Sequence, residues 1–126
     1  MTTAPHHPVS IAPGGAYALS YEVTRPERTL YISGQIPTAP DGTVPESFEA
    51  QCRQVWANLD QVLAEAGMSR RDLVKVTTFL GDRRYREENS RIRRELLGGH
   101  LPALTVVIAE IYDPAWLLEI EAIAAR

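Results

Sequence analysis

The chain has 126 residues, of which 44% are hydrophobic and 23% are charged, as is usual for one soluble globular domain. Its formal net charge of −3 gives no overall attraction for nucleic acid, and its single cysteine, Cys52, excludes an intrachain disulfide. The sequence has no apolar run near the ~20 residues that cross a membrane, and its N-terminus does not resemble a signal peptide. We therefore expect a cytoplasmic protein that does not bind membranes.

The N-terminal part of the chain predicts a flexible lead-in over residues 1–14, followed by a single domain over residues 15–126. Residues 15–23 and 29–35 alternate apolar and polar side chains, which is typical of β-strands. The connection between these two strands is short and contains Pro26. It therefore favours an antiparallel hairpin.

Two amphipathic helices are predicted in the middle of the chain. Thr43 and Glu46 fit a capping box at the start of the first helix, and Gly67 fits the position just after its end. Asp82 can cap the second helix, which we expect to end at Gly98. Apolar residues recur every three or four positions in both segments, so each helix should cover a sheet with one face.

Three more strands are predicted, at residues 73–80 and as two strands within residues 101–126. In the last of these, Glu119 and Glu121 share one face with apolar neighbours, because side chains alternate along a strand. The resulting order, β-β-α-β-α-β-β, predicts an α+β two-layer sandwich in which a mixed sheet carries both helices on one face. The other face is partly apolar, so we expect the protein to self-associate.

Several short motifs resemble those of the Rid family, the reactive intermediate deaminases that act on imines and enamines. They are Gly15-Ala-Tyr17, Ser33-Gly34-Gln35-Ile36-Pro37, Pro102-Ala-Leu-Thr-Val106 and Glu119-Ile-Glu-Ala-Ile-Ala124, and they occur in the family's order. The resemblance covers residues 15–125. It implies a chorismate-mutase-like fold, a homotrimer with sites at subunit interfaces, and hydrolysis of a small C–N substrate without a cofactor.

The resemblance also implies roles for individual residues. Glu119 occupies the place of the catalytic carboxylate that orients or activates the attacking water. One carboxylate can deprotonate water and then protonate the departing amine. The substrate-binding positions implied in the same way are Tyr17, Ser33, Gly34, Asn89, Leu104 and Thr105.

Simpler structural roles stay open for three of these residues. Asn89 interrupts an apolar helical stripe and could tie a loop to its helix. Ser33 could bond to backbone at the end of its strand, and Glu119 could be an exposed strand residue.

Leu104 departs from the family pattern, in which an arginine follows the Pro-Ala pair. Such an arginine binds a substrate carboxylate through two parallel hydrogen bonds. Leucine offers no donor and no charge, so we do not expect ordinary 2-aminoacrylate deamination. Either the substrate lacks a carboxylate at this point, or another arginine replaces the missing one, or catalysis is lost.

Residues 83–94 contain six arginines, the densest charge in the chain. Glu87, Glu88 and Glu95 lie three or four residues from Arg91, so we interpret this segment as a solvated face with salt bridges. A replacement anion site and an RNA-binding surface are the less favoured interpretations. No group of histidine, cysteine and carboxylate residues has the spacing of metal ligands, so we expect no metal.

Three functions are consistent with the sequence. The first is a divergent Rid-like deaminase that hydrolyses a small imine, enamine or related C–N substrate. The second is a non-catalytic protein of the same fold that binds a small molecule or another protein. RNA binding or cleavage is the third, and the negative net charge disfavours it.

Overall fold

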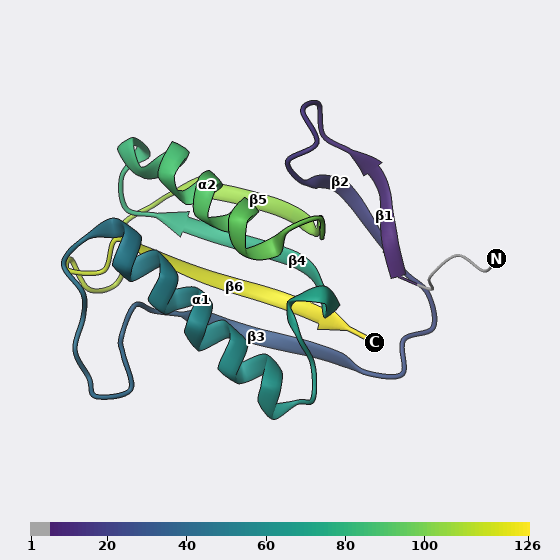
Figure 1. The fold of residues 1–126 in the computed structure, drawn as a ribbon, viewed down its shortest axis with the longest axis horizontal. Helices are drawn as coiled ribbons and strands as arrows, with labels where there is room; N and C mark the ends of the chain where they lie inside the picture. The colour runs from purple at the N-terminus through teal and green to yellow at the C-terminus, as the bar shows by residue number, and fades with distance from the viewer. Residues whose placement is uncertain (1–5) are drawn as a thin grey trace.

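The computed structural model describes residues 6–126 as one mixed sheet with two helices on the same face (Figure 1). The strands are β1 (His6–Ile11), β2 (Ala18–Val23), β3 (Thr29–Gln35), β4 (Leu73–Leu80), β5 (Ala103–Ile108) and β6 (Leu118–Ala125). The helices are α1 (Phe48–Glu65) and α2 (Arg86–Leu97), and 3₁₀ turns at Arg70–Asp72 and Arg83–Tyr85 precede β4 and α2. This arrangement confirms the predicted α+β two-layer sandwich.

Strand β4 lies near the middle of the sheet, whose order is β1-β2-β5-β4-β6-β3. It pairs in parallel with β5 and antiparallel with β6, so the last two strands of the chain lie on either side of it. Helix α2 provides the crossover between β4 and β5 that a parallel pair requires (Figure 1). Among residues 6–126, no helix is both long and apolar enough to cross a membrane.

The predicted hairpin between residues 15–23 and 29–35 is wrong. Strand β2 pairs with β1 and contacts β5, whereas β3 pairs with β6 at the opposite edge of the sheet. The alternation along a strand indicates which side chains face the core, but it does not identify the neighbouring strand. Here β3 finds its partner in β6, nearly a hundred residues later in the chain.

Strand β1 was not anticipated, because its residues belong to the lead-in predicted over 1–14. Residues 6–11 pair antiparallel with β2, and the hydroxyls of Ser10 and Ser20 are 2.8 Å apart. Val9 and Ile11 are both exposed, so the backbone ladder rather than core burial holds this strand. The apolar residues of this segment therefore do not mark a buried strand face. Residues 1–5 of the lead-in lie outside the described residues.

The core lies between the two helices and the sheet. Its largest fully buried side chains include Trp56, Leu59 and Leu63 from α1, Ile92 from α2, and Leu73, Leu80 and Ile120 from the strands. Burial of one such aliphatic side chain contributes about 1.5–3 kcal/mol. This apolar layer fixes both helices over the sheet and thereby positions the side chains at their ends.

The start of α1 differs from the predicted capping box. Ser47, not Thr43, is the N-cap, and its hydroxyl accepts a hydrogen bond from the backbone N–H of Ala50 at 3.1 Å. Thr43 instead donates its hydroxyl to Asp41 at 2.7 Å. An aspartate two residues away competes for the threonine locally, as is common in turns.

The predicted glycine ends of both helices are confirmed, whereas Asp82 caps the 3₁₀ turn before α2 and the N-cap of α2 itself is Tyr85. Gly67 follows α1 with a φ of +70°, and the backbone N–H of Met68 donates to the carbonyl of Leu63 at 2.9 Å, as in a Schellman motif. Asp82 accepts from the N–H of Arg84 at 2.9 Å and so caps the turn that leads into α2. Gly98 ends α2 with a φ of +60°.

Gln51 connects α1 to two loops and is almost completely buried. Its amide donates to the carbonyls of Pro45 and Ala115 at 2.8 and 2.9 Å, and its oxygen accepts from the N–H of Leu117 at 2.8 Å. We expect Gln51→Met to lower the free energy of unfolding by about 3 kcal/mol. Each of the three lost hydrogen bonds has a net contribution of ~1 kcal/mol, and the carbonyls of Pro45 and Ala115 lose their donor.

Urea unfolding followed by circular dichroism would measure this change. Gln61→Met is the matched control, since Gln61 is exposed and its one hydrogen-bond partner among residues 6–126 is Glu65, at 3.4 Å. It should change stability by less than about 0.5 kcal/mol. Equal effects of the two substitutions would contradict the role assigned to Gln51.

Candidate functional site

The sheet has one face covered by the helices and one open face, and strand register assigns the candidate residues to them. Leu104 pairs with Val76, whose side chain is fully buried beneath the helices. Glu119 pairs with Phe79, which lies on the other face of β4 because neighbouring strand residues alternate. Leu104 and Glu119 therefore lie on opposite faces of the same sheet.

A cavity of about 730 Å³ opens on the helix-covered side, between α2, β5 and the segment before β2. Three of the predicted substrate-binding residues line it, namely Tyr17, Asn89 and Leu104. A second hollow of about 490 Å³ beside Arg70 contains none of the predicted residues. Arg70 is held there by Asp60 at 2.6 Å and the carbonyl of Leu96 at 2.9 Å, so its role is structural.

Leu104 forms part of the apolar floor of this cavity. Leu80, Val106 and Ile108, on the same face of β4 and β5, complete the floor. The position after Pro-Ala thus presents hydrocarbon to a ligand. A carboxylate placed directly on this floor would lose its hydration without a compensating donor, which is unfavourable.

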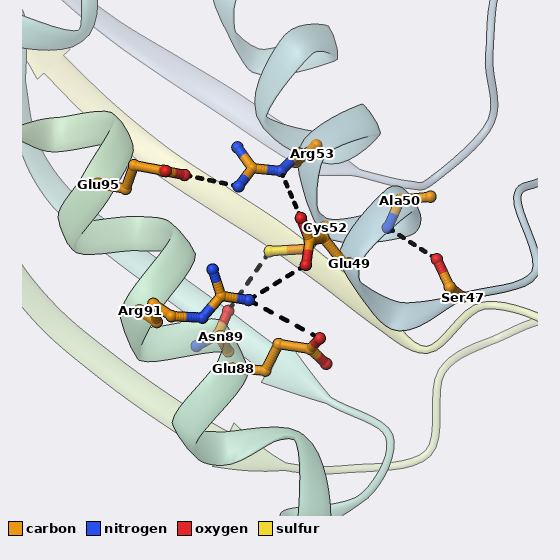
Figure 2. Close-up of polar contacts among 9 residues, drawn as sticks. All are labelled: Ser47, Glu49, Ala50, Cys52, Arg53, Glu88, Asn89, Arg91 and Glu95. Atoms are coloured by element: carbon orange, nitrogen blue, oxygen red, sulfur yellow. Dashed lines mark hydrogen bonds and ion pairs between the residues drawn. The ribbon is translucent and has the colours of Figure 1, made fainter.

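Asn89 is 2% exposed and points from α2 toward Cys52 on α1 (Figure 2). The thiol of Cys52 lies 3.9 Å from the side-chain oxygen of Asn89. The Asn89 amide nitrogen has no protein acceptor within the described part of the chain. It is therefore available as a hydrogen-bond donor to a molecule in the cavity.

Cys52 is a structural thiol in this setting. It is fully buried, and burial raises its pKa to about 12. The thiolate is the reactive form of cysteine, so Cys52 is protonated and unreactive near neutral pH. Asn89 and Cys52 together join the two helices above the sheet.

The second group of predicted residues lies on the open face. Register between β3 and β6 shifts between Ile32 and Gln35, so Ser33 and Gly34 lie in a bulge. The Glu119 carboxylate lies across Gly34, and a Cβ at position 34 would overlap its Oε2 atom. Ser33 is exposed within this bulge, and its carbonyl accepts from the side-chain amide of Gln35 at 3.0 Å.

Glu119 is partly buried and has no hydrogen-bond or ion-pair partner among residues 6–126. The carboxylate is thus held over a glycine that leaves room for it, with its oxygens unoccupied. Thr105 lies on the same open face as Glu119, and its hydroxyl accepts from the only lysine, Lys75, at 2.6 Å. Thr105 does not share the cavity of Leu104, its neighbour in the sequence.

The predicted salt-bridged face of the arginine-rich segment is present around Arg91. Its guanidinium lies 3.1 Å from Glu49 and 3.9 Å from Glu88, and Arg53 joins Glu49 to Glu95 (Figure 2). Hydrogen bonds to Arg53 and Arg91 hold the pKa of Glu49 below its usual range. This network fits the solvated face expected from the sequence.

Arg93 departs from that expectation. It is 5% exposed and lines the cavity with Tyr17 and Asn89, and the exposed Arg83 and Arg86 lie at the same cavity. Arg93 follows Asn89 by four residues, a spacing that places both on one helix face. This four-residue spacing is the signal in the sequence that separates Arg93 from the other arginines of the segment.

No cluster of histidine, cysteine and acidic side chains that could hold a metal ion occurs in residues 6–126. His100 serves the fold, because its ring nitrogen Nε2 lies 2.7 Å from the carbonyl of Leu73 and its ring contacts Tyr21 edge-on. The polar groups that line the cavity include the Asn89 amide, the Tyr17 phenol and the arginines, and the Glu119 carboxylate lies on the other face of the sheet.

Comparison with known proteins agrees with the motifs. Residues 9–126 match the family model described as endoribonuclease L-PSP. A 2-iminobutanoate/2-iminopropanoate deaminase of Rattus norvegicus is 32% identical over 114 residues, 89% of this chain and 81% of that protein. A RutC family protein of Pyrococcus horikoshii is 36% identical over 99 residues, 77% of this chain and 79% of that protein.

A solved structure from Yersinia pestis has the same fold. It is titled as a protein of unknown function of the conserved Rid protein family, YyfB, and superposes with a TM-score of 0.83 at 25% identity. The match covers 98% of this chain and all (100%) of that chain. The agreement extends over both layers of the sandwich.

Proposed function

Because the chain belongs to the Rid family, whose sequence model is described as endoribonuclease L-PSP, we propose that it hydrolyses a small imine or enamine at sites shared between protomers. The rat relative named as a 2-iminobutanoate/2-iminopropanoate deaminase supports this class of reaction. The proposed products are a carbonyl compound and ammonia.

The main observation behind the proposal is that the candidate residues lie on opposite faces of the sheet. Tyr17, Asn89 and Leu104 belong to the cavity beneath α2, whereas Glu119 belongs to the open face. A single chain cannot bring both groups to one substrate, because the sheet lies between them. A site that uses both groups needs the open face of one protomer against the cavity of the next.

The composition of the open face supports such an assembly. Tyr31 is 77% exposed there, and Val107 is exposed on the same face beside Phe79. Exposed apolar side chains of this size favour burial against another protein surface. Together with family membership, this face supports a homotrimer in which identical heterologous contacts close into a ring.

The proposed reaction needs one base and one acid in succession. Glu119 accepts a proton from water as the water oxygen attacks the imine carbon. It returns this proton to the nitrogen, which gives a carbinolamine. Glu119 then takes the proton of the new hydroxyl and passes it to the same nitrogen, so that the C–N bond breaks, the carbonyl forms and ammonia leaves. The Asn89 amide and Tyr17 phenol orient the substrate in the cavity.

Ammonia release from imines generated in situ tests this function. The panel should pair imines that carry a carboxylate with matched imines that do not, and sedimentation should measure the assembly state. Leu104 predicts that 2-aminoacrylate is a poor substrate compared with larger imines. The absence of turnover on the whole panel, or a monomer in solution, would contradict the proposal.

The glycine beneath Glu119 provides a further prediction. We expect Gly34→Ala to reduce imine hydrolysis at least about tenfold, because the new methyl group must displace the Glu119 carboxylate. Stability should change little, since the displaced group is the flexible end of a side chain and Gly34 has no positive φ. Steady-state rates and thermal melting would measure the two effects.

Gly99→Ala is the matched control, because a Cβ there meets nothing within 4 Å. It should leave the rate unchanged within about twofold. Wild-type activity in Gly34→Ala would show that the position of the Glu119 carboxylate is unimportant.

The apolar floor at Leu104 favours a second candidate, a protein of this fold that binds a small molecule without hydrolysing it. This function predicts a ligand-dependent rise in melting temperature with no ammonia release over the same panel. Turnover of the ligand that stabilises the protein would exclude it.

A further inference from the structure

We propose that Arg93 is the anion-binding residue of the cavity and selects ligands that combine an anionic group with an apolar body. This inference deepens the proposed function, on which its catalytic meaning depends. It assigns to helix α2 the charge that is missing from position 104 on the sheet.

Arg93 is a cation inside the protein without an anion. It is 5% exposed, and its one hydrogen bond within the described chain runs from Nη2 to the Ser90 hydroxyl at 3.2 Å. No carboxylate pairs with it among residues 6–126. Removing a guanidinium from water without a counter-ion is unfavourable, so this position favours the arrival of an anion.

The charged side chains around Arg93 are other arginines, which add positive charge rather than neutralise it. Burial and the neighbouring Arg94 lower the pKa of Arg93 from its usual value, although an arginine stays protonated at neutral pH. Arg83 and Arg86 add positive charge at the exposed side of the cavity, and none of its lining residues in the described part of the chain is acidic. An anion in this cavity therefore meets only cations and neutral groups.

Arg91, two residues before Arg93, differs from it in both burial and ion pairing. Arg91 is exposed and pairs with Glu49 at 3.1 Å. This ion pair accounts for Arg91. No such pair accounts for Arg93 among residues 6–126, and its planar guanidinium faces a cavity of about 730 Å³.

The opposite wall of the cavity defines the other half of the ligand. Leu80, Leu104, Val106 and Ile108 form an apolar floor on the strands, while Arg93 belongs to the helix wall. A matching ligand carries its carboxylate or similar anion toward α2 and lays hydrocarbon on β4 and β5. Both walls contribute only if the ligand has both parts, so a small anion without an apolar body binds more weakly.

Calorimetric titration of the purified oligomer with three probes tests this assignment. Phenylacetate has both features, phenylacetamide lacks the charge, and acetate lacks the apolar body. We expect phenylacetate to bind at least about tenfold more tightly than either other probe. Phenylacetamide cannot form the charge-assisted hydrogen bond to Arg93, and acetate leaves the apolar floor empty. Equal affinities for phenylacetate and phenylacetamide would overturn the proposal.

Variants of α2 identify the residue responsible. Arg93→Gln should weaken phenylacetate binding by about tenfold to a hundredfold, and Arg93→Lys should retain part of the affinity. Arg94→Gln is the matched control, since it removes the same charge from the same helix at an exposed residue outside this cavity. It should change affinity by less than about threefold.

The remaining outcomes also decide the question. Unchanged phenylacetate binding in a folded Arg93→Gln protein would contradict the assignment, as would dissociation of the oligomer, which would indicate that Arg93 pairs with a second copy. If Arg93→Gln does not fold, the wild-type probe series and Arg93→Lys still decide. These titrations involve no turnover, so a protein that binds phenylacetate through Arg93 without hydrolysing imines would contradict the proposed activity alone.

Discussion

Replacement of Glu119 by glutamine is expected to lower the rate of imine hydrolysis by about a hundredfold to ten-thousandfold, the usual contribution of general acid–base catalysis. Glutamine keeps the shape of the side chain over Gly34 but cannot accept a proton from water. Substrate affinity should change much less, because the cavity residues that hold the substrate are left unchanged. The measurements are kcat and KM from ammonia release.

Glu121→Gln is the matched control for this substitution. Glu121 is exposed two residues further along β6, on the same face and opposite Thr77. Its replacement removes the same charge and should leave kcat within about threefold of the wild-type value. Equal losses in both variants would indicate a general electrostatic effect, and wild-type activity in Glu119→Gln would remove Glu119 from the mechanism.

The two layers of the fold could be predicted from the sequence, because helix ends, helix caps and apolar stripes depend on local chemistry. Helix ends at Gly67 and Gly98 require a positive φ, and the cap at Asp82 requires a side-chain acceptor, so both were visible in single residues. The apolar stripes identified the helix faces that pack on the sheet. Family motifs then located Tyr17 and Glu119 in the fold.

The pairing of each strand and the burial of each arginine could not be predicted from single residues in the same way. The lead-in was expected to be flexible from the composition of its first residues, yet residues 6–11 form an edge strand held by backbone bonds to β2. Likewise, Arg91 and Arg93 look equivalent in a charged segment. Only the packing of α2 against the sheet separates a solvated arginine from a buried one.

Two inactive variants are expected to restore each other's activity when their subunits are mixed. Leu104→Trp should fill the cavity from its floor, and Glu119→Gln should remove the base on the open face. Each homo-oligomer would then have a defect in every site. In a mixed oligomer, an intact cavity from one protomer can meet an intact Glu119 from another.

The expected recovery follows from the symmetry of the contact. If each site uses the cavity of one protomer and the open face of its neighbour, random mixing in equal amounts makes about a quarter of the sites fully wild-type. Unfolding and refolding the two variants together, followed by ammonia assays, would measure this fraction against variants refolded separately. No recovery in mixtures that sedimentation shows to be co-assembled would mean that one protomer supplies the whole site. Because the sheet separates Leu104 from Glu119, that result would require a substrate-binding surface other than the cavity beneath α2.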